Sequence, residues 1–279
     1  MAQVRIVTDS SAELTLEAAA ALNITVVPWR LRLGAETVTD EPARRNPSFY
    51  KELARRRVLP VALPPGAADL RAAYGALCGE NTDIISIHPS LELAPLLRAA
   101  HQARAGFLGR CQIAVINAQF ISRALGSLVT EAATAAQQGM PAADVVRLVH
   151  NRIPNTYMAV HVENREHLTR LGLYREDNTV LPEGAARPLL LIEQGQFVPL
   201  IRSRNRGTPV ERLVEFVAEF QRCDQVALLH AGAPATVQQF AEQLALVLPG
   251  LTFEEHVYGP VFYSYAGPHA LCLMVREHV

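Results

Sequence analysis

Short apolar segments alternate with helical patterns through the first half of the chain, and this order constrains its fold more than any other feature. β-Branched runs at 4–7, 83–88 and 112–116 each end in polar residues, which is typical of buried strands. Helical patterns separate them along the sequence. Because parallel strands need long crossover connections that usually contain a helix, this order predicts a parallel, right-handed α/β domain.

The second half of the chain has a mixed pattern. Apolar runs at 188–192 and 196–201 flank Glu193-Gln194-Gly195 and predict a hairpin. Further helices and strands are expected at 165–171, 208–222, 225–230, 233–248, 252–257 and 270–275. We therefore expect two domains: an N-terminal, Rossmann-like α/β/α domain with a parallel sheet (1–154) and a C-terminal α+β domain with a mixed sheet (155–279).

Composition excludes several classes of protein. The 279 residues are 49% hydrophobic and 19% charged, which is typical of a globular chain and not of a disordered one. The formal net charge of −1 argues against a nucleic-acid-binding module. Nearly all of the positive charge is arginine, and Lys51 is the only lysine.

The four cysteines are far apart in the sequence and form no CxxC pair, so we expect no zinc site and a reducing compartment. His161 and His167 do not have the spacing of a metal-binding pair either. No apolar stretch approaches the roughly 18 residues of a membrane helix, and no signal peptide is evident. The sequence therefore predicts a soluble, cytoplasmic protein without a transmembrane segment.

Polar residues follow the ends of the three predicted strands. Asp9-Ser10, His88 to Ser90 and Asn117 should meet at one edge of the sheet, which is where open α/β sheets bind ligands. Glu13 lies three residues after Ser10, the spacing of a capping box. Helix capping is thus an alternative role for this first turn.

The segments that follow complete the predicted first domain. We expect a helix at 14–22, a strand at 24–33 and a polar loop at 38–47. Prolines exclude a helix or a central strand at 59–66, so we expect an apolar irregular loop there. Such a loop should pack against a neighbouring domain or an apolar ligand.

Several stretches, taken together and in order, resemble the DegV family, whose members bind fatty acids. The resemblance extends over almost the whole chain. It is carried by 7–14 (Val-Thr-Asp-Ser-Ser-Ala-Glu-Leu), 26–30, 86–88, 187–190, 198–206 with 211–213, 229–231, and 259–261 with 267–268.

The resemblance implies the family's two-domain (EDD) fold, with one acyl chain in a tunnel between the domains. The carboxylate end would lie near the carboxyl ends of the first domain's strands. Some members are the fatty-acid-carrying subunit of a bacterial fatty acid kinase and present the ligand to a separate ATP-binding subunit. The chain agrees in having neither a GxxxxGK[ST] nor a GxGxxG loop. We expect no cofactor other than the bound lipid, no catalytic residue and no metal.

The residues that resemble the family's carboxylate-binding motifs differ here in chemistry. Val61-Ala62 stands where a Thr-Thr loop is usual, Ala94 where a Ser-Gly-Thr is usual, and Tyr265 where a histidine is usual. Other hydroxyl groups and an arginine could take over the polar role. The predicted ligand-binding residues are Ser10, Val61, Ala62, His88, Ser90, Ala94, Arg204, Ser264, Tyr265 and Gly267.

Two functions follow from the resemblance and a third from the residue types at the strand ends. The first is a non-catalytic carrier of a long-chain fatty acid or similar acyl lipid. The second keeps the fold but binds an isoprenoid or fatty alcohol, because a carboxylate lacking hydrogen bonds is costly to bury. The third is a serine-dependent hydrolase using Asp9, Ser10 and His88, although the G-x-S-x-G elbow is missing and Asp9 next to Ser10 is poorly placed to orient His88.

Overall fold

The first half of the protein is built on a four-stranded parallel sheet, as predicted. The computed structural model describes residues 2–56, 59–162, 168, 171–174, 189–200 and 207–278. The sheet has the order β2-β1-β6-β7. Its strands are β1 (Gln3–Asp9), β2 (Thr25–Val27), β6 (Thr82–His88) and β7 (Gln112–Asn117).

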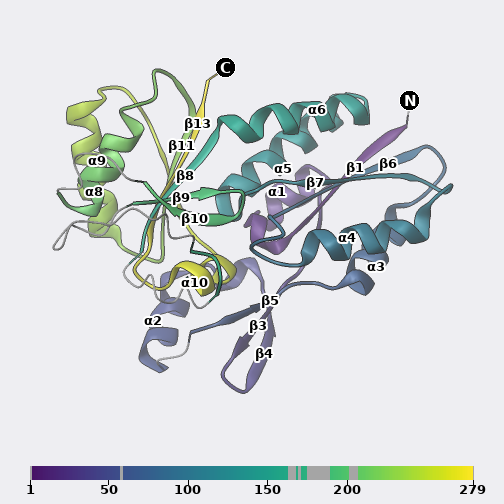
Figure 1. Cartoon of the computed structure of the whole chain (residues 1–279), viewed down its shortest axis with the longest axis horizontal. Helices are drawn as coiled ribbons and strands as arrows, with labels where there is room; N and C mark the ends of the chain where they lie inside the picture. The colour runs from purple at the N-terminus through teal and green to yellow at the C-terminus, as the bar shows by residue number, and fades with distance from the viewer. Residues whose placement is uncertain are drawn as a thin grey trace.

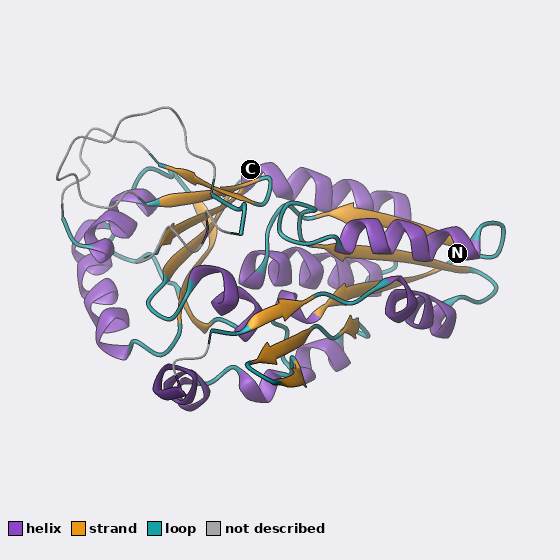
Figure 2. Ribbon diagram, turned by 60° about the horizontal axis from the view of Figure 1, so that its bottom comes forward, coloured by secondary structure: helices purple, strands orange, loops and turns teal. Residues whose placement is uncertain are grey.

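Helices cover both faces of this sheet (Figures 1 and 2). Helices α3 (Ala67–Leu77) and α4 (Leu96–Arg104) pack together on one side, and α5 (Ser122–Gln137) and α6 (Ala142–Arg152) on the other. Helix α5 lies so close to the turn after β1 that a Cβ on Gly126 would be 2.2 Å from the carbonyl oxygen of Ala12. Only glycine fits there, and this close contact fixes the turn against the helix.

A small antiparallel sheet corrects three predictions for residues 24–66. The expected single strand at 24–33 divides at Pro28-Trp29 into β2, in the parallel sheet, and β3 (Arg30–Leu33). Strand β4 (Glu36–Thr39) extends into the loop expected at 38–47, and β5 (Val61–Leu63) lies in the loop expected at 59–66. The two strands pair with the two edges of β3. Strand β5 tolerates its flanking prolines because it is an edge strand. Helix α2 (Pro47–Arg56) joins β4 to β5.

The second half contains a six-stranded mixed sheet of order β10-β9-β8-β13-β11-β12. Its pairs are antiparallel except β11–β12. The strands are β8 (Thr156–His161), β9 (Leu190–Glu193), β10 (Gln196–Pro199), β11 (Cys223–His230), β12 (Glu254–Val257) and β13 (Leu271–Glu277). Helices α8 (Pro209–Val217) and α9 (Pro234–Val247) pack side by side against it (Figure 1).

The hairpin and the mixed sheet are thus confirmed, and the fold class is a two-domain α/β fold. The boundary expected at 154/155 falls within the 3-10 turn η4 (Ile153–Asn155) and stays a prediction. The short helix expected at 165–171 lies mostly outside the described residues.

Helix α10 (Pro260–Ala266) was not predicted, and it connects the two halves. All seven of its residues are buried. It lies beside β5 and α2 of the first half (Figure 1), and its Tyr263 ring stacks on Tyr50 of α2 at 4.8 Å between centroids. Tyr50 in turn donates its hydroxyl hydrogen bond to the carbonyl of Tyr258. A segment from the end of the chain therefore completes the core of the first half.

Two of the four cysteines are paired, which differs from the reducing compartment that their spacing predicted. Cys78 and Cys111 are joined as a disulfide with Cα atoms 5.9 Å apart, because the end of α3 lies next to the start of β7. Cys223 and Cys272 are free. No helix in the described part of the chain is long and apolar enough to cross a membrane.

Candidate ligand-binding site

The turn after β1 does not contain the predicted capping box, and two other residues cap the helical segments there. Asp9 is the N-cap of a 3-10 turn, η1 (Ser10–Ala12), and its carboxylate accepts a 3.1 Å hydrogen bond from the amide of Ser11. Thr15 caps the following helix, α1 (Leu16–Ala21). Glu13, the C-cap of this turn, has a left-handed backbone (φ 56°), and its amide donates to the carbonyl of Ser10 at 3.0 Å. Its carboxylate instead binds other segments.

Asp9 is the centre of a hydrogen-bond network at the carboxyl end of the parallel sheet. Its Oδ1 accepts from the indole Nε1 of Trp29 at 2.7 Å, and its Oδ2 lies 2.7 Å from Nδ1 of His88. Nε2 of His88 lies 2.7 Å from the Ser86 hydroxyl, which accepts from the Tyr74 hydroxyl at 2.8 Å. All five side chains are fully buried.

This network corrects the expectation that Asp9 is poorly placed to orient His88. A carboxylate only accepts, so His88 donates to Asp9 from Nδ1, and its Nε2 faces the Ser86 hydroxyl. The order of Ser86, His88 and Asp9 is that of a nucleophile triad, but none of the three is exposed to solvent. Ser10 takes no part in it. The arrangement braces the sheet edge and gives no support to the serine-hydrolase alternative.

The predicted hydroxyl ligands donate their protons within the protein. Ser90 donates to the carbonyl of Gln194 at 2.8 Å, Ser264 to that of Val261 at 2.7 Å, and Tyr265 to that of Leu93 at 3.2 Å. A hydroxyl has one proton, so each of these groups faces any further partner as an acceptor.

Ser10 is bonded within the protein as an acceptor. Its oxygen accepts a 3.0 Å hydrogen bond from the amide of Trp29. Burial raises the pKa of Asp40 to about 6, although Ser10 and Arg45 oppose the rise. Burial also raises the pKa of the Tyr265 phenol, and the nearby Asp9 carboxylate adds to that rise.

The remaining predicted residues lie around the same junction. Ala94 is buried, and its amide bonds to the carbonyl of Ser90 in the loop that Tyr265 contacts. Val61 and Ala62 belong to β5 beside α10, with Val61 44% exposed. The carbonyl of Gly267 accepts from the Tyr258 hydroxyl at 2.9 Å. Arg204 lies outside the described residues, and the ligand contacts of the whole set stay a prediction.

Glu13 is a further residue at the junction whose role the sequence did not indicate. Its Oε1 accepts from the amide of Gly259 at 2.6 Å, and its Oε2 lies 2.7 Å from Nε2 of His256. The hydroxyl of Ser122 on α5 donates to the same Oε2. This side chain, 1% exposed, thus joins the turn after β1 to the residue before α10. Its partners are 109 to 246 residues away, so no local spacing could reveal them.

Comparison with known proteins gives a consistent result over the full length. Residues 3–278 match the family model described as "Uncharacterised protein, DegV family". The chain is 29% identical to a DegV domain-containing protein of Streptomyces coelicolor, with 98% of each chain covered.

Solved structures agree. The structure of DegV, described as a fatty acid binding protein from Bacillus subtilis, superposes with a TM-score of 0.82 at 21% identity and covers 99% of this chain and 100% of that one. The fatty acid binding DegV family protein SAG1342 from Streptococcus agalactiae superposes with a TM-score of 0.83 at 18% identity, with both chains fully covered.

Proposed function

Because the chain belongs to the DegV family, we propose that it is a non-catalytic carrier of a long-chain fatty acid or similar acyl lipid, held between its two domains. The observation that carries the proposal is the full-length structural likeness to proteins described as fatty acid binding. Three segments would form the apolar walls: α10, β5 and the loop that contains Leu93 and Ala94.

Burial of the acyl chain would supply the affinity. Each buried methylene contributes about 0.8 kcal/mol, so a C14–C18 chain gains on the order of 10 kcal/mol before the costs of binding. The head group gains nothing from burial and needs hydrogen bonds. The choice of head group therefore depends on the donors and acceptors at the carboxyl end of the parallel sheet.

The second candidate, a ligand with an uncharged end such as a fatty alcohol or isoprenoid alcohol, is favoured by the hydroxyl geometry. Ser90, Ser264 and Tyr265 all donate to main-chain carbonyls. Their oxygens would accept from a ligand hydroxyl but would repel a carboxylate. A carboxylate would need other donors, and Arg204 is the residue that the resemblance offers.

A partner kinase is the finer part of the proposal and rests on the resemblance alone. The chain would present the ligand's polar end, and the partner would hold the nucleotide. This arrangement is consistent with the missing phosphate-binding loops. We propose a cytoplasmic location on the same basis.

Binding of palmitate and of hexadecanol, which share a chain length, would separate the two ligands. Calorimetry on delipidated protein should give palmitate the higher affinity if the first candidate is correct. The reverse order by tenfold or more would support the second, since one poorly satisfied charged group costs about that much. If neither ligand binds, and mass spectrometry of solvent extracts finds no co-purified lipid, both candidates are wrong.

A pair of variants would locate the site. Val61→Asp places a charge on the proposed apolar wall at a position where 44% exposure should leave folding intact. Leu108→Asp is the matched control, because Leu108 is 74% exposed and far from the junction in the fold. We expect Val61→Asp to weaken lipid binding at least tenfold and Leu108→Asp to leave it unchanged.

A further inference from the structure

The two most exposed large apolar side chains in the described part of the chain lie at opposite ends of the molecule. Leu246, 82% exposed, is on α9, and Leu108, 74% exposed, lies in the connection between α4 and β7, which forms a tip (residues 105–111). Figure 1 shows α8 and α9 at one end and this connection at the other. Single exposed leucines are common on protein surfaces, but these two lie in patches of opposite charge.

Leu246 lines an apolar groove between α8 and α9. The groove has a volume of about 480 Å³, and Ala218 and Val247 line it together with Leu246. All three side chains are exposed, so water covers an apolar surface at this end of the protein. The groove is large enough to receive an apolar side chain from another molecule.

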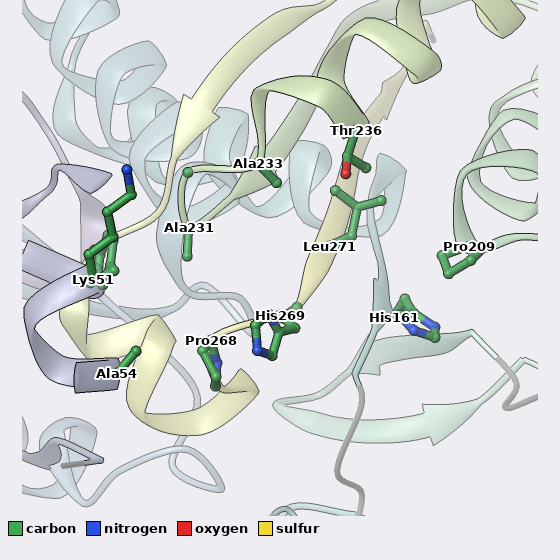
Figure 3. Close-up of a pocket in the computed structure, with 13 residues that line it drawn as sticks. Lys51, Ala54, His161, Pro209, Ala231, Ala233, Thr236, Pro268, His269 and Leu271 are labelled. Atoms are coloured by element: carbon green, nitrogen blue, oxygen red, sulfur yellow. The ribbon is translucent and has the colours of Figure 1, made fainter. Parts of the chain in front are cut away.

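The N-terminal end of α9 belongs to a different pocket. Ala233 and Thr236 line that pocket, of about 370 Å³, and share it with Lys51, His161 and His269. Figure 3 shows that Lys51 points away from both histidines, so the polar groups of the pocket do not converge on one ligand. The groove at Leu246 shares no lining residue with this pocket.

The groove between α8 and α9 is acidic. Glu211 and Glu215 of α8 and Glu219 just after it recur at every fourth residue, and all three line the groove. None of the described residues that line it is basic. Arg212 is the only basic residue of α8 and is buried, and the sequence from 223 to 275 contains neither lysine nor arginine. A partner of this groove therefore needs positive charge around an apolar group.

The tip at the other end of the molecule is basic. Three arginines lie in it or directly beside it: Arg71, Arg104 and Arg110. The sequence from 93 to 130 contains no acidic residue. Glu80 and Asp83 of the neighbouring segments leave an excess of positive charge. The tip thus combines an exposed leucine with the sign of charge that the groove attracts.

The tip is held in one conformation. Gly109 has a left-handed backbone (φ 77°), which glycine adopts without strain. The amides of Arg110 and Cys111 both donate to the carbonyl of Phe107, whose ring is buried. The guanidinium carbon of Arg110 lies 5.7 Å from the centroid of that ring. Because the turn is already ordered, burial of Leu108 in a partner would cost little conformational freedom.

We propose that the protein associates head to tail with a second copy of itself, the tip of one copy inserting Leu108 into the α8–α9 groove of the next. Leu108 would pack on Leu246 and Val247, and the arginines of the tip would face the glutamates of the groove. The occupant is a second copy because the chain itself carries an ordered apolar tip of the required charge. The contact does not involve the proposed lipid site.

The geometry of this contact determines the assembly. The two surfaces differ, so the contact is heterologous: a dimer still has one unoccupied groove and one unoccupied tip, and further copies can add. One tip in one groove forms a small interface, so we expect a weak association that depends on protein concentration.

Two variants, each of which disables one surface, test the proposal. Leu246→Gln changes the groove and Leu108→Gln changes the tip, at exposed positions where glutamine should leave the thermal unfolding temperature unchanged. In sedimentation velocity at rising concentration, the parent chain should form dimers and larger species, and each variant alone should associate at least tenfold more weakly. An equimolar mixture of the two variants retains one intact groove and one intact tip. It should therefore associate as strongly as one parent contact and stop at the dimer.

A control variant and salt complete the test. Leu16→Gln should leave association unchanged, because Leu16 is 68% exposed on α1 and belongs to neither surface. Raising the NaCl concentration from about 0.05 M to about 0.5 M should weaken association of the parent chain, since it screens charges at exposed sites.

Three results would overturn the proposal. A parent chain that stays monomeric at every concentration would leave the groove to a different basic partner. A mixture of the two variants that associates no better than either variant alone would exclude a contact between tip and groove. An association that does not respond to salt would exclude the charge complementarity of the two surfaces.

Discussion

Two buried carboxylates, Asp9 and Glu13, are four residues apart in sequence and serve different parts of the molecule. Among the described residues, Asp9 hydrogen-bonds only to groups of the first half, including Trp29 and His88. Glu13 binds His256 and Gly259 of the second half. Asp9, before the short 3-10 turn, thus stabilises the parallel sheet, and Glu13, after the turn, joins the two domains.

Burial alone does not decide what a carboxylate does. Both groups are shielded from water and both face a histidine nitrogen at 2.7 Å. The two carboxylates differ in which half of the chain supplies their partners. We therefore expect loss of Asp9 to lower global stability and loss of Glu13 to loosen the junction between the halves. Asp40 lies near both, and both charges help to raise its pKa.

The largest effect is expected from Asp9→Ala. Removing the carboxylate leaves the buried donors of Ser11, Trp29 and His88 without their acceptor. At about 1–3 kcal/mol per unsatisfied group, partly relieved by local shifts, the loss should be about 3–5 kcal/mol. Urea unfolding would measure it. Asp144→Ala, at an exposed ion pair, should change stability by no more than about 0.5 kcal/mol. Equal losses in the two variants would contradict the role given to Asp9.

A smaller, pH-dependent effect is expected from Asp40→Asn. The folded pKa of Asp40 is raised from 3.8 to about 6, so its favourable contribution is complete below pH 3.8 and is lost as the pH rises through about 6. An asparagine does not ionise. The variant should therefore match the parent protein near pH 3.5 and exceed it by about 2–3 kcal/mol above pH 7. A difference that does not change with pH would show that Asp40 is not the group that titrates.

The smallest effect on global stability is expected from Glu13→Gln. The amide keeps one acceptor for Gly259 but loses the second carboxylate oxygen, which accepts from Ser122 and faces His256. We expect a loss of about 1–2 kcal/mol. Hydrogen exchange should accelerate at the Gly259 amide, while amides of β6 keep their protection. If hydrogen exchange accelerated equally at the amides of β6, Glu13 would affect the whole protein, as expected for Asp9, and not the junction alone.

The sequence predicted those parts of the fold that have a local pattern. The buried strands of the parallel sheet are short β-branched runs, and the hairpin has its turn at Gln194-Gly195. The strands and the hairpin could therefore be predicted from the sequence. Helix α10 was missed because all seven residues are buried, which removes the polar face that makes a helix periodic. Strand β5 was missed because prolines indicate a loop unless the strand lies at an edge.

The gathering of polar residues at the strand ends was predictable, and the hydrogen bonds between them were not. The strand ends do gather Asp9 and His88, as parallel strands require. Which hydroxyl donates to which carbonyl depends on tertiary contacts such as Ser90 with Gln194 and Tyr265 with Leu93, over separations of 104 and 172 residues. No local sequence rule encodes such distances.

The late position of α10 in the chain has a consequence for biosynthesis. All strands of the parallel sheet have been translated once β7 has left the ribosome. Helix α10, which packs beside the small antiparallel sheet of the first half, is translated more than a hundred residues later. Because domains fold as units from the N-terminus onward, the nascent first half exposes the apolar surface that Tyr263 and Tyr265 later cover. A chaperone or a lipid could thus bind this apolar surface before translation ends, and not only after the protein is complete.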